Sequence, residues 1–91
     1  MKSREIERRE EWLADSLRRA QRRLGIRTQD EFAEQIGMTR STYQNRLREP
    51  GTTTLNELWR IEAAFRHAGM TDEADTIRFA FASGSRKAGA A

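Results

Sequence analysis

Residues 28–43 of this 91-residue chain read TQDEFAEQIGMTRSTY, and the pattern of this segment is the most informative in the sequence. Thr28 and Glu31 have the spacing of a capping box, which predicts that a helix begins there. Gly37 ends this helix after about eight residues, too few for a helix to be stable without tertiary contacts. Thr39 is a suitable cap for a second helix directly afterwards. The stretch therefore predicts two short helices joined by a tight turn.

Residues within these two helices and in the turn between them have the properties that a steep helix crossing needs. Ala33 is small enough for two helices to approach closely, and Gly37 allows the positive φ of a tight turn. Tyr43 and Leu47 are four positions apart and face inward from the second helix, which runs to about residue 48 before the single proline, Pro50. This spacing is that of a helix-turn-helix motif.

The rest of the chain also has helical periodicity, because apolar residues recur at intervals of three and four. One helix is predicted to start at Arg4 or later and to end at Leu24. Another begins at the capping box of Thr54 and Glu57, and a last one begins at Thr71. The sequence therefore predicts an all-α fold, a compact bundle of about five helices.

The length predicts one domain. Residues 1–11 form a charged N-terminal segment, for which a helical extension and a frayed end both remain open. Residues 12–82 are expected to form the folded domain, and residues 83–91 a disordered tail because they offer nothing large to bury. In the fourth predicted helix, the apolar residues are expected to belong to the core; these are Leu55, Leu58, Trp59, Ile61 and Phe65.

Several function classes find no support in the sequence. The chain has no cysteine and a single histidine, His67, so no metal site is expected. There is no nucleophile at a recognisable spacing from His67 and no glycine loop for a phosphate, so neither enzyme activity nor a cofactor is expected. No apolar run approaches the roughly 20 residues that span a bilayer, which predicts a cytoplasmic protein without membrane contact.

The charge distribution favours a nucleic acid as partner. The net charge is +3, and fifteen of the seventeen basic residues are arginine, whose planar fork suits phosphate or guanine. The outer face of the second motif helix is polar, and there is no acidic residue between Thr39 and Arg48. Five side chains on this face are able to hydrogen-bond to base edges or phosphates; these are Arg40, Ser41, Gln44, Asn45 and Arg46.

Residues 28–43 resemble the phage repressor and Cro-like helix-turn-helix regulators, through Gln29, Ala33 and Gly37 at intervals of four. The resemblance covers about residues 13–65 and implies a lambda-repressor-like domain. It further implies a sequence-specific transcription regulator of double-stranded DNA, expected to be a repressor of phage, prophage or bacterial origin. Base reading would fall to Arg40, Ser41, Gln44 and Asn45, and phosphate binding to Gln29, Thr39, Arg46 and the polar tip of Tyr43.

Two departures from the family pattern matter. Arg46 stands where an apolar residue is common, and Leu47 follows one place later, which predicts a slight roll of the helix. Whether Gln44 or Asn45 reaches deeper into the groove therefore stays open. The first motif helix also carries three acidic residues that should face away from phosphates; these are Asp30, Glu31 and Glu34.

A homodimer is the expected assembly, because operators read by this motif contain two half-sites. The last helix has surplus apolar surface. Its residues Ile77, Phe79 and Phe81 either belong to the core or are the candidate dimer contacts, and both readings remain open. The same helix is also available to a protein partner. Three alternatives remain open: a helical protein-interaction adaptor, an antitoxin-type protein with this fold, and an architectural protein that binds DNA without sequence preference.

Overall fold

The computed structural model describes residues 4–79, and these residues form helices with no strand. The elements in chain order are α1 (Arg4–Arg23), α2 (Gln29–Gln35), α3 (Arg40–Arg48), a short 3₁₀ helix η1 (Pro50–Thr52), α4 (Leu55–His67) and a helix over 71–79. The predicted all-α bundle is confirmed. The proposed tail, 83–91, lies outside the described residues.

The helix starts follow the predicted capping residues. The side chains of Thr28, Thr39 and Thr54 each accept a hydrogen bond from the backbone N–H three residues later. At Thr54 the box is complete, because the Glu57 carboxylate also accepts from the Thr54 N–H at 2.9 Å. These caps satisfy amides that have no partner within their own helix.

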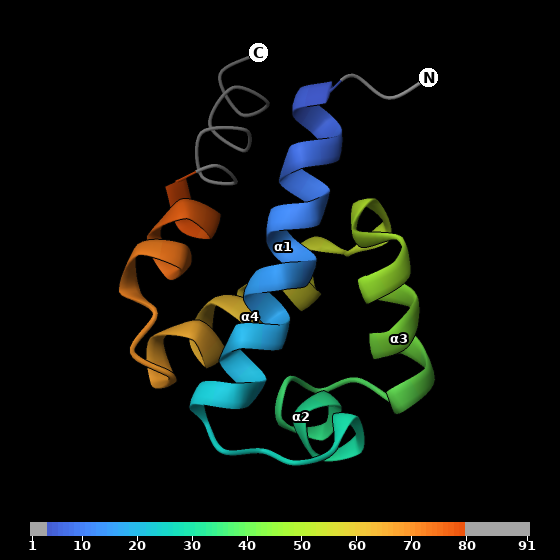
Figure 1. The fold of residues 1–91 in the computed structure, drawn as a ribbon, viewed down its shortest axis with the longest axis vertical. Coiled ribbons are helices and arrows are strands. Elements are labelled where there is room, and N and C mark those ends of the chain that lie inside the picture. The colour runs from blue at the N-terminus through green and yellow to red at the C-terminus, as the bar shows by residue number, and fades with distance from the viewer. Residues whose placement is uncertain (1–3, 80–91) are drawn as a thin grey trace.

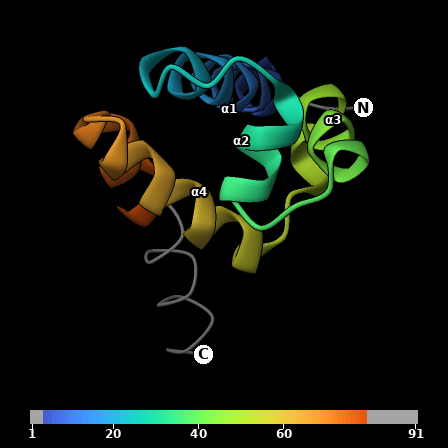
Figure 2. The ribbon, with the colours of Figure 1, turned by 90° about the horizontal axis from the view of Figure 1, so that it is seen from below.

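Helix α1 lies across one side of the fold, and its first turns rise beyond the other helices (Figures 1 and 2). The segment 4–11, whose order the sequence left open, is helical here. Further along α1, Leu13, Leu17 and Ala20 face the core and are buried. No helix within 4–79 is both long and apolar enough to cross a membrane.

Helix α4 buries a narrower face than its sequence suggests. Leu58, Ile61 and Phe65 are buried as predicted, but Leu55 is 46% exposed and Trp59 is 40% exposed. The prediction that Leu55 and Trp59 belong to the core was therefore wrong. Because α4 directs its Leu58 side inward, residues 55 and 59 fall at the edge of the buried face and reach solvent.

The helix over 71–79 is packed against α1 and α4. Arg66 donates to both Glu62 and Asp75, each at 2.9 Å, and Arg19 pairs with Glu73 at 3.1 Å. Ile77 is only 2% exposed and belongs to the core, so of its two predicted roles the core role is confirmed and the dimer contact is corrected. Phe79 is 67% exposed, and Phe81 lies outside the described residues.

Candidate nucleic-acid interface

The turn between α2 and α3 is closed by backbone hydrogen bonds around Gly37. Gly37 has a φ of +71°, a conformation that an L side chain rarely adopts. The Met38 N–H donates to the Ala33 carbonyl at 2.8 Å. From α4, Arg60 Nη1 donates to the Gly37 carbonyl at 3.0 Å. The turn that presents α3 is thus held by a residue that the sequence analysis did not single out, because the contact spans 23 residues.

An aromatic contact fixes the two motif helices against each other. The rings of Phe32 in α2 and Tyr43 in α3 meet edge to face, with centroids 5.4 Å apart. Tyr43 is fully buried, and its hydroxyl has no hydrogen-bond partner among the described residues. Burial raises the pKa of Tyr43 to about 12, and the nearby charge of Arg18 partly offsets this. The predicted phosphate contact of Tyr43 is therefore corrected, because a hydroxyl enclosed in the core does not reach DNA.

The four candidate base-reading residues share the outer side of α3. Arg40, Ser41, Gln44 and Asn45 are all exposed there. Residues four apart on a helix lie one above the other, so Arg40 and Gln44 form one row while Ser41 and Asn45 form the next. The structure thus brings these side chains together on one polar surface, which we call the α3 face.

Two contacts connect the α3 face to the start of α2. Gln44 Nε2 donates to Gln29 Oε1 at 3.0 Å, and Arg40 Nη1 lies 3.8 Å from Asp30 Oδ2. Asp30 therefore does not face away from the α3 face, contrary to expectation. Both partners of this ion pair are more than half exposed, so the pair restrains Arg40 only weakly and gives way readily to a stronger acceptor.

Gln29 and Thr39 occupy the starts of the two motif helices. Gln29 is the first residue of α2, where the helix dipole favours an anion. Thr39 caps α3, and its Oγ1 accepts from the Thr42 N–H at 3.1 Å while donating to Thr42 Oγ1 at 3.0 Å. Gln29 is half-buried and Thr39 exposed, so both polar groups remain within reach of a ligand on the α3 face.

Arg46 turns toward α4 and away from the α3 face. Its Nε donates to Glu57 Oε1 at 2.8 Å and its Nη2 to Glu57 Oε2 at 3.3 Å, while Nη1 donates to Thr52 Oγ1 at 3.2 Å. The hydrogen bond with Glu57 raises the pKa of Arg46 and lowers that of Glu57. The predicted phosphate contact of Arg46 is corrected, because its guanidinium is occupied in joining α3 to η1 and α4.

Arg48 is a cation on the exposed side of α3 that the sequence analysis passed over. Its Nη2 donates to Asn45 Oδ1, three residues earlier. Its place on the exposed side could have been predicted from the sequence, because Arg48 lies one helical turn beyond Gln44 and Asn45. With Arg46 turned inward, Arg48 supplies the positive charge at this end of the α3 face.

Comparison with known proteins agrees with this geometry. Residues 19–66, more than half of the chain, match the helix-turn-helix family model of the Cro and CI repressor type. No curated protein and no solved structure matches the chain. The matched residues include the whole of α2, the Gly37 turn and α3. The chain therefore belongs to the phage repressor and Cro-like helix-turn-helix family of DNA-binding regulators.

Proposed function

We propose that this protein binds double-stranded DNA sequence-specifically and represses transcription by occupying an operator. The observation that carries the proposal is the α3 face. Four hydrogen-bonding side chains stand exposed on one side of a short helix that contains no carboxylate. Such a helix fits the major groove, where base edges present distinct patterns of donors and acceptors.

Different residues of the α3 face are suited to bases and to phosphates. Arg40 has a forked guanidinium that matches the two acceptors of guanine, and Gln44 and Asn45 have amides that match adenine. Ser41 lies beside them and is able to donate or accept. Gln29, Thr39 and Arg48 border this surface, and we assign them to phosphates, which position the domain without reading sequence.

Gln29 has a second role in this proposal, because its hydrogen bond holds the amide of Gln44 in place. A phosphate bound at the start of α2 would hold Gln29, and Gln29 would in turn orient Gln44 toward a base. The contact at 3.0 Å therefore links the positioning group to a reading group. Base reading by Gln44 then depends on correct docking of α2.

The experiment compares Arg40→Ala and Gln29→Ala on two duplexes, one selected for tight binding and one of random sequence. Loss of Arg40 is expected to weaken binding to the selected site by about 1 to 3 kcal/mol and to relax one base position. Loss of Gln29 is expected to weaken binding to both duplexes because a phosphate contact is lost, and to weaken binding to the selected duplex more because Gln44 also loses the hydrogen bond that orients it. Phe79→Ala, an exposed residue outside the motif, is the matched control.

One outcome of this experiment would contradict sequence-specific binding. If both variants lose the same affinity on selected and random DNA, the α3 face does not read sequence. Binding should also weaken steeply as salt increases, because phosphate contacts release counterions. A protein-interaction adaptor with this fold would show no such DNA affinity at any salt concentration.

A further inference from the structure

We propose that Asp30, in the first turn of α2, determines specificity by offsetting the charge of Arg40, so that this arginine contacts guanine in preference to phosphates. The inference rests on the proposed function, in which Arg40 reads a base. The observation that carries it is the ion pair across the motif, in which Arg40 Nη1 lies 3.8 Å from Asp30 Oδ2. Asp30 itself makes no contact with DNA in this proposal and acts through Arg40.

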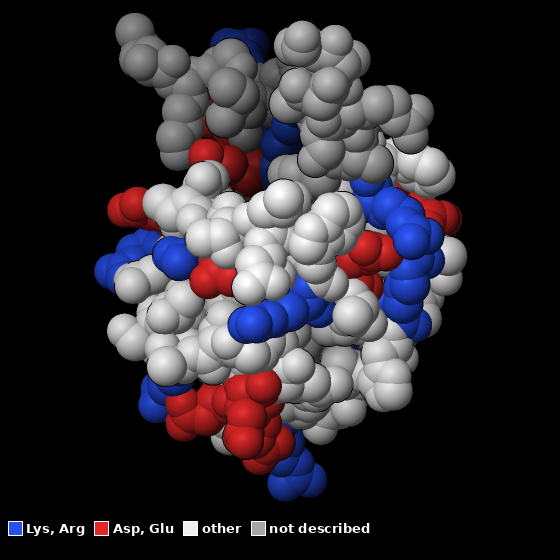
Figure 3. Space-filling model, turned by 180° about the vertical axis from the view of Figure 1, so that it is seen from behind, with Lys and Arg blue, Asp and Glu red and all other residues white. Residues whose placement is uncertain are grey.

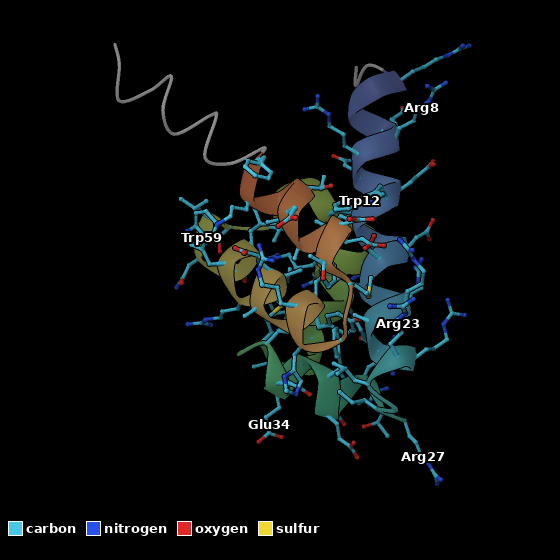
Figure 4. All side chains as sticks on the ribbon, turned by 90° about the vertical axis from the view of Figure 1, so that its left-hand side faces the viewer. Arg8, Trp12, Arg23, Arg27, Glu34 and Trp59 are labelled. Carbon is cyan, nitrogen blue, oxygen red and sulfur yellow. The ribbon has the colours of Figure 1, made fainter. Side chains whose placement is uncertain are left out.

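The carboxylates of α2 differ in their surroundings. The helix carries Asp30, Glu31 and Glu34, and Figure 3 shows acidic side chains exposed together at the lower end of the fold, where α2 lies in Figure 1. Figure 4 shows Glu34 pointing away from the bundle. Asp30 forms an ion pair with α3, whereas the other two carboxylates form none with a described residue. Asp30 is therefore the acid of α2 whose charge reaches the α3 face.

Two arginines of the α3 face differ in their partners. Arg40 is paired with a carboxylate, whereas Arg48 donates to the uncharged amide of Asn45 and forms no ion pair with a described residue. A phosphate is attracted to both guanidinium groups, but at Arg40 it is also repelled by Asp30. This contrast agrees with the assignment of Arg48 to a phosphate and of Arg40 to a base.

The contact with Asp30 leaves free the donors that guanine needs. A guanidinium has five N–H groups in a fixed planar fork. Because Asp30 approaches Nη1, the edge formed by Nε and Nη2 of Arg40 stays available, and its two parallel N–H groups match O6 and N7 of guanine. Guanine carries no net charge, so Asp30 repels it far less than it repels a phosphate. Asp30 thus weakens phosphate binding at Arg40 more than it weakens base reading.

Asp30 has a second effect that must be separated from this one. A carboxylate in the first turn of a helix stabilises that helix through its dipole, and Asp30 shares this turn with Glu31. Glu31 is exposed and forms no ion pair with a described residue. Glu31→Gln therefore removes the same charge from the same turn while leaving Arg40 paired, which makes it the matched control for Asp30→Asn.

The test measures binding of the wild type and both variants to the selected and the random duplex over a range of salt concentrations. On random DNA, Asp30→Asn should bind several-fold more tightly than Glu31→Gln. The slope of log affinity against log salt should steepen by about 0.9 for Asp30→Asn, the value for one additional phosphate contact. Glu31→Gln should leave this slope unchanged.

On the selected duplex, Asp30→Asn should gain no more affinity than Glu31→Gln, because Arg40 is engaged by a base there. The preference for the selected duplex should therefore fall several-fold in Asp30→Asn. Asp30→Glu keeps the carboxylate and should keep the preference, which a loss of helix stability alone would not explain. Circular dichroism melts confirm that each variant is folded.

Two further measurements assign the effect to Arg40. In an Arg40→Ala background, Asp30→Asn should change the affinity for random DNA no more than Glu31→Gln does. Retention on heparin, a polyanion without bases, examines phosphate-like contacts apart from base reading. Asp30→Asn should elute from heparin at a higher salt concentration than Glu31→Gln.

Equal effects of Asp30→Asn and Glu31→Gln on random DNA and on heparin would overturn the role of Asp30. An increase in affinity that survives in the Arg40→Ala background would overturn it as well. A wild-type protein without preference for the selected duplex would contradict the proposed function instead. The heparin result is independent of that preference, so the two failures are distinguishable.

Discussion

Arg46 on α3 and Glu57 in the first turn of α4 form a two-point ion pair, with N to O distances of 2.8 Å and 3.3 Å. Glu57 also completes the capping box of Thr54. One carboxylate therefore starts α4 and fixes its position relative to the helix that we propose reads DNA. Both side chains are mostly buried, at 20% and 15% exposed, so solvent screens this pair less than a surface pair.

This pair predicts strong coupling between the two residues. Arg46→Ala and Glu57→Ala should each lower the free energy of unfolding, and the double variant should be more stable than the sum of the two losses predicts. We expect a coupling energy of about 1 to 2 kcal/mol, measured by urea denaturation in a double-mutant cycle. The surface pair of Arg18 and Asp15 is the matched control, with a coupling of less than about 0.5 kcal/mol. Additive losses at Arg46 and Glu57 would contradict the predicted coupling.

The same pair predicts a loss of stability in acid. The hydrogen bond from Arg46 holds the pKa of Glu57 below its ordinary value of 4.5. A carboxyl with a depressed folded-state pKa contributes stability above its unfolded pKa and loses it as the pH falls through the folded value. Thermal melts from pH 6 down to pH 3 should therefore show a steeper decline for the wild type than for Glu57→Gln. Parallel curves would exclude Glu57 as a source of the acid dependence.

Tyr43 predicts a loss of stability at alkaline pH. Its hydroxyl is enclosed without a partner among the described residues, so Tyr43→Phe should stabilise the protein by about 1 kcal/mol. Because burial raises the pKa of Tyr43 to about 12 from 10.0, its neutral form contributes stability below pH 10 that is lost as the pH rises toward 12. Denaturation curves at pH 9 and pH 11 should differ less for Tyr43→Phe than for the wild type. A destabilised Tyr43→Phe would reveal a partner for the hydroxyl.

Two glycines at the ends of helices offer a matched comparison. Gly25 and Gly37 have similar φ angles, +69° and +71°, so alanine at either position bears the same backbone strain of about 1 to 2 kcal/mol. A Cβ at Gly25 would meet nothing within 4 Å, whereas at Gly37 it would lie 2.6 Å from Arg60 Nη1. Gly37→Ala should therefore be more destabilising than Gly25→Ala. Arg60→Ala should reduce the difference, and an unchanged difference would show that the Arg60 contact is not its cause.

Much of the fold is predictable because its signals are local. The caps at Thr28, Thr39 and Thr54 each act over three residues, and the positive φ of Gly37 is a property of that one position. Such features depend little on the rest of the chain. The helix starts and the motif turn were accordingly predicted, and so was the exposed side of α3 except for Arg46.

The errors concern side chains whose positions depend on distant partners. Arg46 stands at an apolar position of the family pattern, and it turns inward because Glu57, eleven residues later, satisfies its charge. Leu55 and Trp59 have helical spacing with the core residues, but the angle at which α4 packs decides which of them reach solvent. Ile77 was a candidate both for the core and for a dimer surface, and its burial in the core decides between the two. Periodicity along one helix contains no information about such packing.

The most direct test of sequence-specific DNA binding is an in vitro selection from randomised duplex DNA with the purified protein near physiological salt. We predict enrichment of an inverted repeat whose half-sites lie about one helical turn apart, because two copies would each place α3 in the major groove. Selection with Arg40→Ala should yield the same repeat with one base position relaxed. If the wild-type protein enriches no sequence, the α3 face does not read DNA and the proposed function is wrong.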